Sequence, residues 1–274
     1  DSLFFTPADW AWVGGLLDTL LPGWAYGVPV LGYGGRFQPR TIFDLMARYG
    51  VTHSFMPPTA LKQLAQVPNP RDTWDLKLRV ISTGGEPLPA ATLTWLEREL
   101  DVAVIEFYGL SECNHLVGNC RRVWPIKPGS MGRAYPAHQT TLIDDQGQPV
   151  PQGEVGQIAA HRSDPILFLG YWNRPDRTAE KFAGDWMRTG DLGRMDADGC
   201  FFFAARSDDV ITSSGYRIGP SEIEDCLCRH PAVAMAAVVG EPDPLRTEIV
   251  VAHVVPKPDA APDAALADAL MAHV

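Results

Sequence analysis

The feature that most restricts the fold is a regular alternation, between residues 28 and 108, of short β-branched runs with segments of helical period. Such alternation is typical of βαβ units, in which helices join parallel strands and cover the sheet. The expected strands are Val28–Leu31, Val51–Met56, Leu78–Ser82 and Val102–Phe107, and the expected helices are Pro39–Tyr49, Pro57–Gln66 and Pro89–Leu100. We therefore predict an α/β fold with a mostly parallel sheet in this part of the chain.

The character of the sequence changes after about Arg121, where Gly, Pro and short strands dominate. Hairpin-type turns are expected at 144–147 (DDQG) and 196–199 (DADG), so a β-rich subdomain follows the α/β part. From Asp209 onward, strands surround a helix expected at Pro220–Arg229, an order that suits a small α+β domain.

The element order predicts a seam at 206–208, which separates residues 1–205 from a C-terminal α+β domain, 209–274, that the end of the chain truncates. The chain has no initiator Met and stops inside a helix expected at Pro262–Val274, so the sequence reads as a fragment. Near the start, Thr6 and Pro7 predict the beginning of a helix that carries Trp10 and Trp12.

Composition restricts the partners. A net charge of -10 argues against nucleic acid, because binding to a polyanion requires clustered Lys and Arg. The five cysteines are scattered and form no Cys-x-x-Cys pair, which favours a reduced, cytoplasmic protein over a disulfide scaffold or a zinc site. No membrane span and no secretory signal are expected. Homo-oligomerisation is left open.

Polar residues follow an apolar strand at Phe107–Glu112. Ligands of open α/β sheets bind beyond the carboxyl ends of strands, so this strand end is a natural site. Tyr108 could stack on a purine, Ser111 could donate to a phosphate, and Glu112 could hold Mg²⁺ beside phosphate oxygens. The alternative is a strand-to-helix turn in which Ser111 and Glu112 are caps.

Other short motifs are weaker when each is taken alone. Gly84-Gly85-Glu86 follows another strand, and its glycines let the backbone approach a base or a phosphate, although any βα loop that needs positive φ gives the same residues. Asp191, in Thr189-Gly190-Asp191, could accept both ribose hydroxyls or could close an Asx-type turn. The charged stretch at 206–219 is either a solvated cluster or an anion site coupled to a hinge.

Taken together, the order and spacing of these motifs resemble one family. The chain resembles the adenylate-forming superfamily of acyl-CoA synthetases, firefly luciferase and peptide-synthetase adenylation domains, and most of all its acetyl- and medium-chain acyl-CoA synthetase branch. The matching segments are Asp9-Trp10-Ala11-Trp12, Gly84-Gly85-Glu86, 108–112, Gly129-Ser130-Met131-Gly132-Arg133, Gly170-Tyr171-Trp172, Thr189-Gly190-Asp191, 206–219 and Pro220-Ser221-Glu222-Ile223-Glu224.

The resemblance implies ATP, Mg²⁺, coenzyme A and a small carboxylic acid as ligands. The implied nucleotide site consists of Gly84, Gly85, Glu86 and Tyr108 around adenine, Ser111 at the phosphate, Glu112 at Mg²⁺, and Asp191 and Arg206 at the ribose. The other implied roles are Asp208 as the hinge residue, Gly215 beside the coenzyme A thiol arm, Arg217 at phosphate, and Trp12 in the acyl or pantetheine tunnel. Ser111, Glu112 and Arg217 are thus the implied catalytic set.

Gly109 is the implied determinant of substrate size. In the acetate-specific relatives that this chain resembles, a Trp at the matching position closes the acyl pocket beyond two carbons. Glycine leaves that volume empty, which implies medium-length, branched or aromatic acids. The alternative is that Gly109 supplies the positive φ of a tight turn.

The implied reaction has two halves, in which a carboxylate first attacks the α-phosphorus of MgATP and the thiol of coenzyme A then attacks the acyl-adenylate. The family's phosphate loop would lie upstream of this chain and its catalytic Lys downstream, so the 274-residue chain alone is expected to be inactive. Ala205 in place of the usual Gly, and Thr212 in place of a common Lys, are departures from the pattern. The alternatives are an adenylating domain that loads a carrier protein and a noncatalytic nucleotide- or acyl-binding module.

Overall fold

The computed structural model describes residues 2–121, 123–207, 209–214 and 216–274, and the backbone alone at Arg217. Contacts divide the described chain into two compact units. Unit 1 consists of Asp1–Gln139 and Asp164–Leu169, and unit 2 of Thr140–Ser163 and Gly170–Val274. The short segment Asp164–Leu169 therefore packs with residues that are distant from it in the sequence.

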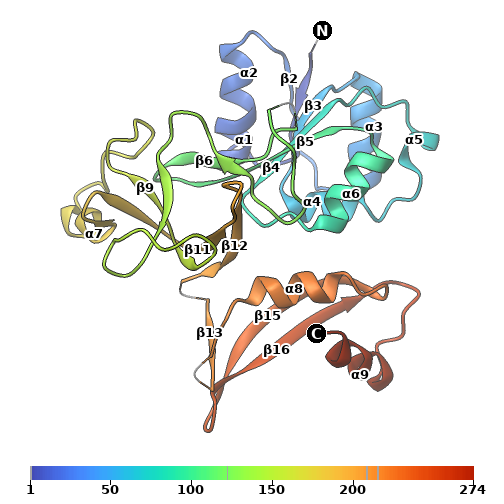
Figure 1. Ribbon diagram of the computed structural model, residues 1–274. Coiled ribbons are helices and arrows are strands. Elements are labelled where there is room, and N and C mark those ends of the chain that lie inside the picture. The colour runs from blue at the N-terminus through green and yellow to red at the C-terminus, as the bar shows by residue number, and fades with distance from the viewer. Residues whose placement is uncertain (1, 122, 208, 215) are drawn as a thin grey trace. The chain divides into compact units, whose positions relative to one another are not determined.

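Unit 1 is built on a sheet with the strand order β2-β1-β3-β4-β5-β6-β7 (Figure 1). Strands β1 to β5 pair in parallel, whereas β6 and β7 are antiparallel. The strands are β1 (Phe4–Phe5), β2 (Val30–Leu31), β3 (His53–Phe55), β4 (Val80–Gly84), β5 (Ala103–Leu110), β6 (Asn114–Gly118) and β7 (Arg133–Ala134). The mostly parallel sheet confirms the predicted α/β class.

Helices cover this sheet and form the main core with it. They are α3 (Pro39–Tyr49), α4 (Pro58–Leu64), α5 (Pro70–Thr73) and α6 (Ala90–Glu99). Helix α3 has the predicted bounds, because Pro39 occupies its first turn and Gly50 caps its end through its backbone N–H. Its buried face, Ile42, Phe43 and Met46, packs against buried side chains of α4, α6 and the strands. Burial of this apolar surface stabilises the unit.

The helix predicted to begin at Thr6 begins later. The structure has α1 (Val13–Gly15), a π-helical turn η1 (Leu16–Leu20) and α2 (Leu21–Ala25). Asp9 causes the difference, since its carboxylate accepts from Ala11 N and its carbonyl accepts from Trp12 N at 3.0 Å. This Asx-type turn competes with helix formation, so Trp10 and Trp12 precede the helix.

Unit 2 contains antiparallel sheets. One runs β10-β11-β9-β8 with β12 also paired to β11, and the other runs β14-β13-β16-β15. The strands are β8 (Thr140–Ile143), β9 (Val155–His161), β10 (Phe182–Ala183), β11 (Trp186–Met195), β12 (Phe201–Arg206), β13 (Ile211–Ser213), β14 (Tyr216–Ile218), β15 (Val233–Asp243) and β16 (Thr247–Pro256). Helix α7 (Pro175–Glu180) lies between β9 and β10 in the sequence.

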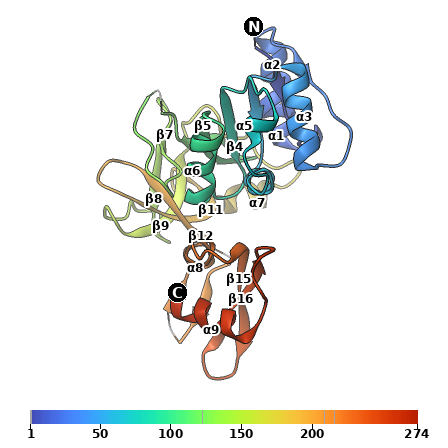
Figure 2. The same cartoon turned by 90° about the vertical axis from the view of Figure 1, so that its right-hand side faces the viewer.

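Figure 2 shows the strands β15 and β16 together with two helices. Buried side chains of this part of unit 2 form a core of their own. Helices α8 (Pro220–Cys228) and α9 (Ala264–His273) contribute Leu227 and Leu270 to it. The predicted α+β order after residue 209 is therefore found. In the part of the chain that the structure describes, no helix is long and apolar enough to cross a bilayer.

Candidate functional site

Two of the sequence motifs lie at the carboxyl ends of neighbouring parallel strands. Gly84 ends β4 and is paired with Phe107 of β5, so Gly84–Glu86 lies beside the end of β5. Tyr108–Leu110 complete that strand, and Ser111 and Glu112 lie in the turn that follows it. Carboxyl ends of parallel strands are where open α/β sheets bind ligands. The structure thus brings together residues that the sequence predicted around adenine, phosphate and Mg²⁺.

A row of aromatic rings borders this edge. Trp12 lies 5.7 Å from Phe55, Phe55 lies 5.8 Å from Phe107, and Phe107 stacks on His115 at 3.8 Å between ring centroids. Trp12 keeps 40% of its surface exposed. Such a row offers an apolar wall for an acyl chain or a planar ring.

Gly85 is required both by its conformation and by its contacts. Its φ of +89° favours glycine, and a Cβ there would lie 3.2 Å from the Trp12 indole. The next residue, Glu86, accepts a hydrogen bond from Thr59 Oγ1 at 2.6 Å. Trp12 and the Gly84–Glu86 loop, which lie far apart in the sequence, therefore belong to one site.

The loop after β4 is supported from behind by buried polar groups. Glu106 Oε1 accepts from Leu88 N at 3.2 Å, and Glu106 Oε2 accepts from Asn119 Nδ2 at 3.3 Å. Asn119 Nδ2 also donates to the carbonyl of Ser130 at 2.5 Å. Buried polar groups require such partners. The Gly129–Arg133 motif is thereby connected to the loop that follows Gly84-Gly85-Glu86.

The turn at Ser111–Cys113 connects two strands, and the alternative of a strand-to-helix turn is wrong. Strand β6 begins at Asn114 and pairs antiparallel with β5, with a register shift between Tyr108 and Gly109. The tight return places Asn114 at a φ of +49°, a conformation that Asn tolerates better than most residues. Local sequence could not reveal this hairpin, because Ser and Glu also suit a helix start.

Gly109 is constrained by a close backbone approach. A Cβ at this position would overlap the carbonyl oxygen of Asn114, and its φ lies outside the left-handed region. The alternative that Gly109 supplies positive φ is therefore wrong. The hairpin requires a glycine here whether or not the residue also leaves room for an acyl chain.

Glu112 is half-buried at the carboxyl end of β5, and its carbonyl accepts from Phe168 N at 2.7 Å. A single carboxylate beside phosphate oxygens is a common way for proteins to bind Mg²⁺. Ser111, its neighbour, is exposed. The donor set fits a metal that a nucleotide brings with it.

The predicted ribose residues lie in unit 2, where they face each other across a strand pair. Asp191 of β11 is in register with Arg206 of β12. Thr189 Oγ1, which is buried, donates to the carbonyl of Ile158 at 2.7 Å and accepts from Asp191 N at 3.1 Å. The hydroxyl thus holds the backbone where the pairing of β11 with β9 is interrupted after Arg188. A strand irregularity of this kind aims a side chain away from the ladder.

The structure describes three of the predicted site residues only in part or not at all. Arg217 lies in β14, where its Cα partner in β13 is Thr212. Asp208 and Gly215 lie outside the described residues, so their assignments stay predictions.

Sequence reasoning missed the pairing of two histidines with buried carboxylates. His115 Nε2 lies 3.1 Å from Asp18 Oδ1, and His138 Nδ1 lies 3.0 Å from Asp164 Oδ1. The Asp18 and Asp164 side chains are 7% and 0% exposed. No periodicity in the sequence connects residues so far apart; only the fold brings them together.

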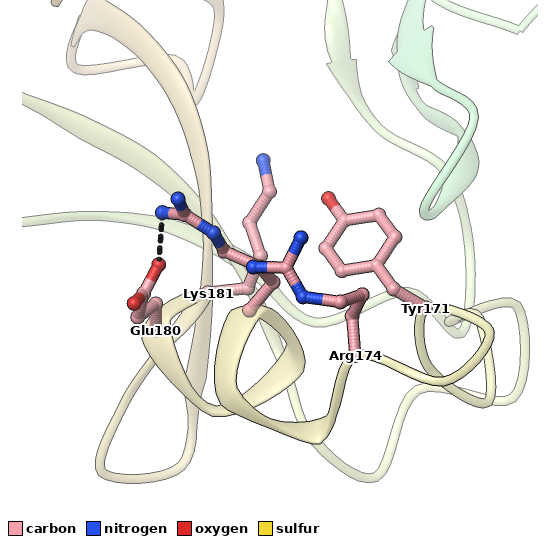
Figure 3. A pocket seen from close by; sticks show the side chains of 5 residues that line it. Tyr171, Arg174, Glu180 and Lys181 are labelled. Atoms are coloured by element: carbon pink, nitrogen blue, oxygen red, sulfur yellow. Dashed lines mark hydrogen bonds and ion pairs between the residues drawn. The ribbon is translucent and has the colours of Figure 1, made fainter.

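A surface cavity of about 600 Å³ lies beside α7 in unit 2 and is lined by Tyr171, Arg174, Arg177, Glu180 and Lys181 (Figure 3). Arg174 donates to Asp176 and lowers the pKa of that carboxyl, and Arg177 pairs with Glu180 at 2.8 Å. Exposed pairs of this kind are screened by solvent and contribute little to stability. Because each guanidinium is matched by a carboxylate of the same short helix, a solvated charged surface accounts for this cavity.

The fold is that of an α/β protein in which a glycine-containing loop and an acid-bearing turn lie where parallel strands end, the place at which open α/β sheets bind ligands. The chain belongs to the AMP-binding enzyme family. The family model for AMP-binding enzymes matches residues 1–172, and the model for the AMP-binding enzyme C-terminal domain matches residues 222–274.

Individual relatives agree with the family. The chain is 39% identical to an uncharacterized acyl-CoA ligase, YtcI of Bacillus subtilis (strain 168), over 86% of this chain and 47% of the relative. It is 36% identical to the mitochondrial acyl-coenzyme A synthetase ACSM3 of Mus musculus, over 94% of this chain and 45% of the relative. The crystal structure of the anthranilate CoA ligase AuaEII with anthranoyl-AMP superimposes with a TM-score of 0.90 at 30% identity, covering 99% of this chain and 52% of that one. The chain thus spans about half the length of the curated relatives it matches.

Proposed function

We propose that the protein containing this chain is an AMP-forming acyl-CoA synthetase. The observation that carries the proposal is the meeting of Gly84–Glu86 and Tyr108–Glu112 at one edge of the sheet, in a chain of the AMP-binding enzyme family. Relatives named as acyl-CoA ligases and synthetases support coenzyme A as the acceptor. The acidic composition and the free cysteines favour a cytoplasmic location, although some relatives are mitochondrial.

In the first half-reaction, a carboxylate oxygen of the acid attacks the α-phosphorus of ATP, an acyl-adenylate forms, and pyrophosphate leaves. In the second, the coenzyme A thiolate attacks the acyl carbon, a thioester forms, and AMP leaves. Catalysis of this kind depends on positioning and on stabilising the developing charge. Tyr108 and the Gly84–Glu86 loop hold adenine, and Ser111 donates to phosphate.

Mg²⁺ supplies positive charge beside the phosphate oxygens when it is bound, and Glu112 is the residue proposed to hold it. Asp191 and Arg206 are proposed to hold the ribose, and Arg217 to contact phosphate. Gly215 is proposed to lie beside the thiol arm of coenzyme A. These roles belong to the whole protein.

We further propose that the acid is medium-length, branched or aromatic. The row of Trp12, Phe55 and Phe107 supports this, because each buried methylene of a substrate contributes about 0.8 kcal/mol. Glycine at position 109 places no side chain where the resemblance implies an acyl pocket. The matched ligase of an aromatic acid, anthranilate, points in the same direction.

The test is a pyrophosphate-exchange assay of the full-length gene product with acetate, butyrate, octanoate and benzoate. We expect exchange with the longer or aromatic acids to exceed that with acetate, and acyl-CoA to form when coenzyme A is added. Transfer to an acyl carrier protein but not to coenzyme A would support the carrier-loading alternative. Nucleotide binding without exchange for any acid would support a noncatalytic module.

Glu112→Gln tests the metal role. The amide keeps the size of the side chain but removes its charge, so we expect the adenylation rate to fall on the order of 100-fold, the upper end of the loss that follows when a metal-site partner is removed. The midpoint of thermal unfolding should stay the same, because the side chain lies at the edge of the sheet. An unchanged exchange rate would remove Glu112 from the site.

A further inference from the structure

A short segment of unit 1, Asp164–Leu169, is held at its beginning by a buried carboxylate. Asp164 is 5% exposed, whereas Pro165 is exposed and Leu169 is fully accessible. The segment belongs to no helix or strand of unit 1. Polar contacts near both ends of the segment help to fix its position.

The Asp164 carboxylate accepts hydrogen bonds from several donors. His138 Nδ1 lies 3.0 Å from Oδ1 and 3.1 Å from Oδ2, Gln139 N donates to Oδ2 at 3.2 Å, and Ile166 N donates to Oδ1 at 3.2 Å. The His138 side chain is 17% exposed. A buried carboxylate that accepts this many hydrogen bonds fixes the groups around it, because each donor would otherwise lose its partner.

The far end of the same segment reaches the candidate site. Phe168 N donates to the carbonyl of Glu112 at 2.7 Å. Glu112 lies in the tight turn between β5 and β6, whose own backbone bond runs from Cys113 N to the carbonyl of Leu110 at 3.0 Å. The bond from Phe168 therefore helps to set the orientation of the peptide that follows Glu112.

We propose that Asp164, together with His138, is a positioning residue for Glu112. The carboxylate holds the segment Asp164–Leu169, the segment presents the Phe168 amide, and that amide holds the Glu112 backbone in the orientation that directs its carboxylate at Mg²⁺. The proposal deepens the proposed function and rests on it for the metal. Asp164 touches no reacting atom, so its effect is confined to the metal-dependent half-reaction.

The test compares Asp164→Ala with wild-type full-length protein in Mg²⁺ titrations of pyrophosphate exchange. We expect the half-saturating Mg²⁺ concentration to rise roughly tenfold, as when an outer-shell partner of a metal site is lost. Thioester formation from supplied acyl-adenylate and coenzyme A should be unchanged. An unchanged Mg²⁺ requirement, or an equal fall in both half-reactions, would overturn the proposal. Asp164→Asn keeps one oxygen acceptor, so the half-saturating Mg²⁺ concentration should rise less than in Asp164→Ala. If the alanine variant does not fold, the same comparison is made with Asp164→Asn.

Asp144→Ala is the matched control. Asp144 Oδ1 likewise accepts from two backbone N–H groups, those of Gln146 at 2.9 Å and Gln148 at 2.8 Å, but it lies in unit 2. Its loss should leave the Mg²⁺ requirement unchanged. An equal rise in the Mg²⁺ requirement of Asp144→Ala would mean that the loss of any such carboxylate-held turn has this effect. It would overturn the specific role of Asp164.

Amide hydrogen exchange separates this proposal from the proposed function, because it does not depend on catalysis. In Asp164→Ala we expect faster exchange at the Phe168 amide and through residues 110–114, with the strands of the sheet unaffected. Unchanged exchange at Phe168 would overturn the positioning role. Faster hydrogen exchange at the Phe168 amide would uphold the structural link. If the same protein showed no pyrophosphate-exchange activity with any acid, that result would count against the proposed function.

Discussion

At the scale of single residues, Gly109 shows how one position can satisfy two demands. The family resemblance directs attention to the acyl pocket, whereas the structure directs it to the backbone of Asn114. A bulky replacement therefore disturbs the β5–β6 hairpin before it fills any pocket. Substrate size is better tested with the wild-type protein and a series of acids than with Gly109→Trp.

Gly109→Ala should destabilise unit 1. A single added methyl group overlaps the carbonyl of Asn114, and overpacking of this kind costs about 1–3 kcal/mol. Denaturant unfolding of the variant and the wild type measures the difference. Gly34→Ala is the control, because a Cβ there meets no atom within 4 Å; similar losses in both variants would contradict the close approach.

Tyr135 adds a pH dependence of stability. Burial, with a smaller contribution from Cys120, raises the pKa of its phenol from 10.0 to about 12. Below pH 10 the folded and unfolded states both keep the proton, and between pH 10 and 12 only the unfolded state releases it. Stability should therefore fall by about 2 kcal/mol as pH rises through this window. Urea unfolding from pH 9 to 12 measures the fall in unfolding free energy, and the Tyr135→Phe variant should lack the part of it that comes from Tyr135. The same dependence on pH in the wild type and the variant would refute the assignment.

At the scale of elements, the bend in β11 places Asp191. The pairing with β9 is interrupted between Arg188 and Leu192, and the Thr189 hydroxyl bonds to both Ile158 and Asp191 across the interruption. A Thr-Gly-Asp sequence by itself indicates only a turn. The long strands on either side convert it into a bend that places Asp191 in register with Arg206.

Thr189→Val keeps the shape of the side chain but removes this hydroxyl. The Ile158 carbonyl and the Asp191 amide then lose a partner, which should cost about 1–3 kcal/mol of unfolding free energy. Thr94→Val removes a hydroxyl that bonds to Ala90 on an exposed helix face, and should change stability by less than about 0.5 kcal/mol. Thermal and denaturant unfolding of the two variants should differ accordingly; equal losses would count against the role of Thr189.

At the scale of the whole molecule, the proposed reaction has two half-reactions. The predicted hinge at 206–208 lies between residues 1–205 and residues 209–274, and a turn about it is expected between the two half-reactions. Conformational steps of this kind are absorbed by a few backbone positions. Asp208, two residues after Arg206, is the position that the resemblance implies.

Asp208→Pro should restrict the backbone at the hinge and so uncouple the half-reactions of the full-length enzyme. One half-reaction, measured as pyrophosphate exchange or as thioester formation from supplied acyl-adenylate, should fall while the other is retained. A fall of both by the same factor would show that position 208 is not the hinge.

Sequence alone was sufficient for the elements whose signals are local. The bounds of α3, the alternation of the main strands and helices between residues 28 and 108, and the family itself could be predicted, because apolar periodicity, proline at a helix start and motif spacing are encoded within short stretches. Strands β1 and β6 and the short helix α5 were not predicted. The start of the first helix could not, since the Asp9 turn competes with the helix signal at Thr6 and Pro7.

The sequence by itself determined the fold class and the family, and it supplies the residues proposed for a nucleotide site. Only the tertiary structure decided that Trp12 lies against Gly85, that the Ser111–Cys113 turn closes a hairpin, and that Asp164 pairs with His138. These outcomes depend on which distant segments share a sheet edge or a buried contact. Contacts of that kind leave no periodic trace in the sequence, because each is made by two residues whose separation along the chain is arbitrary.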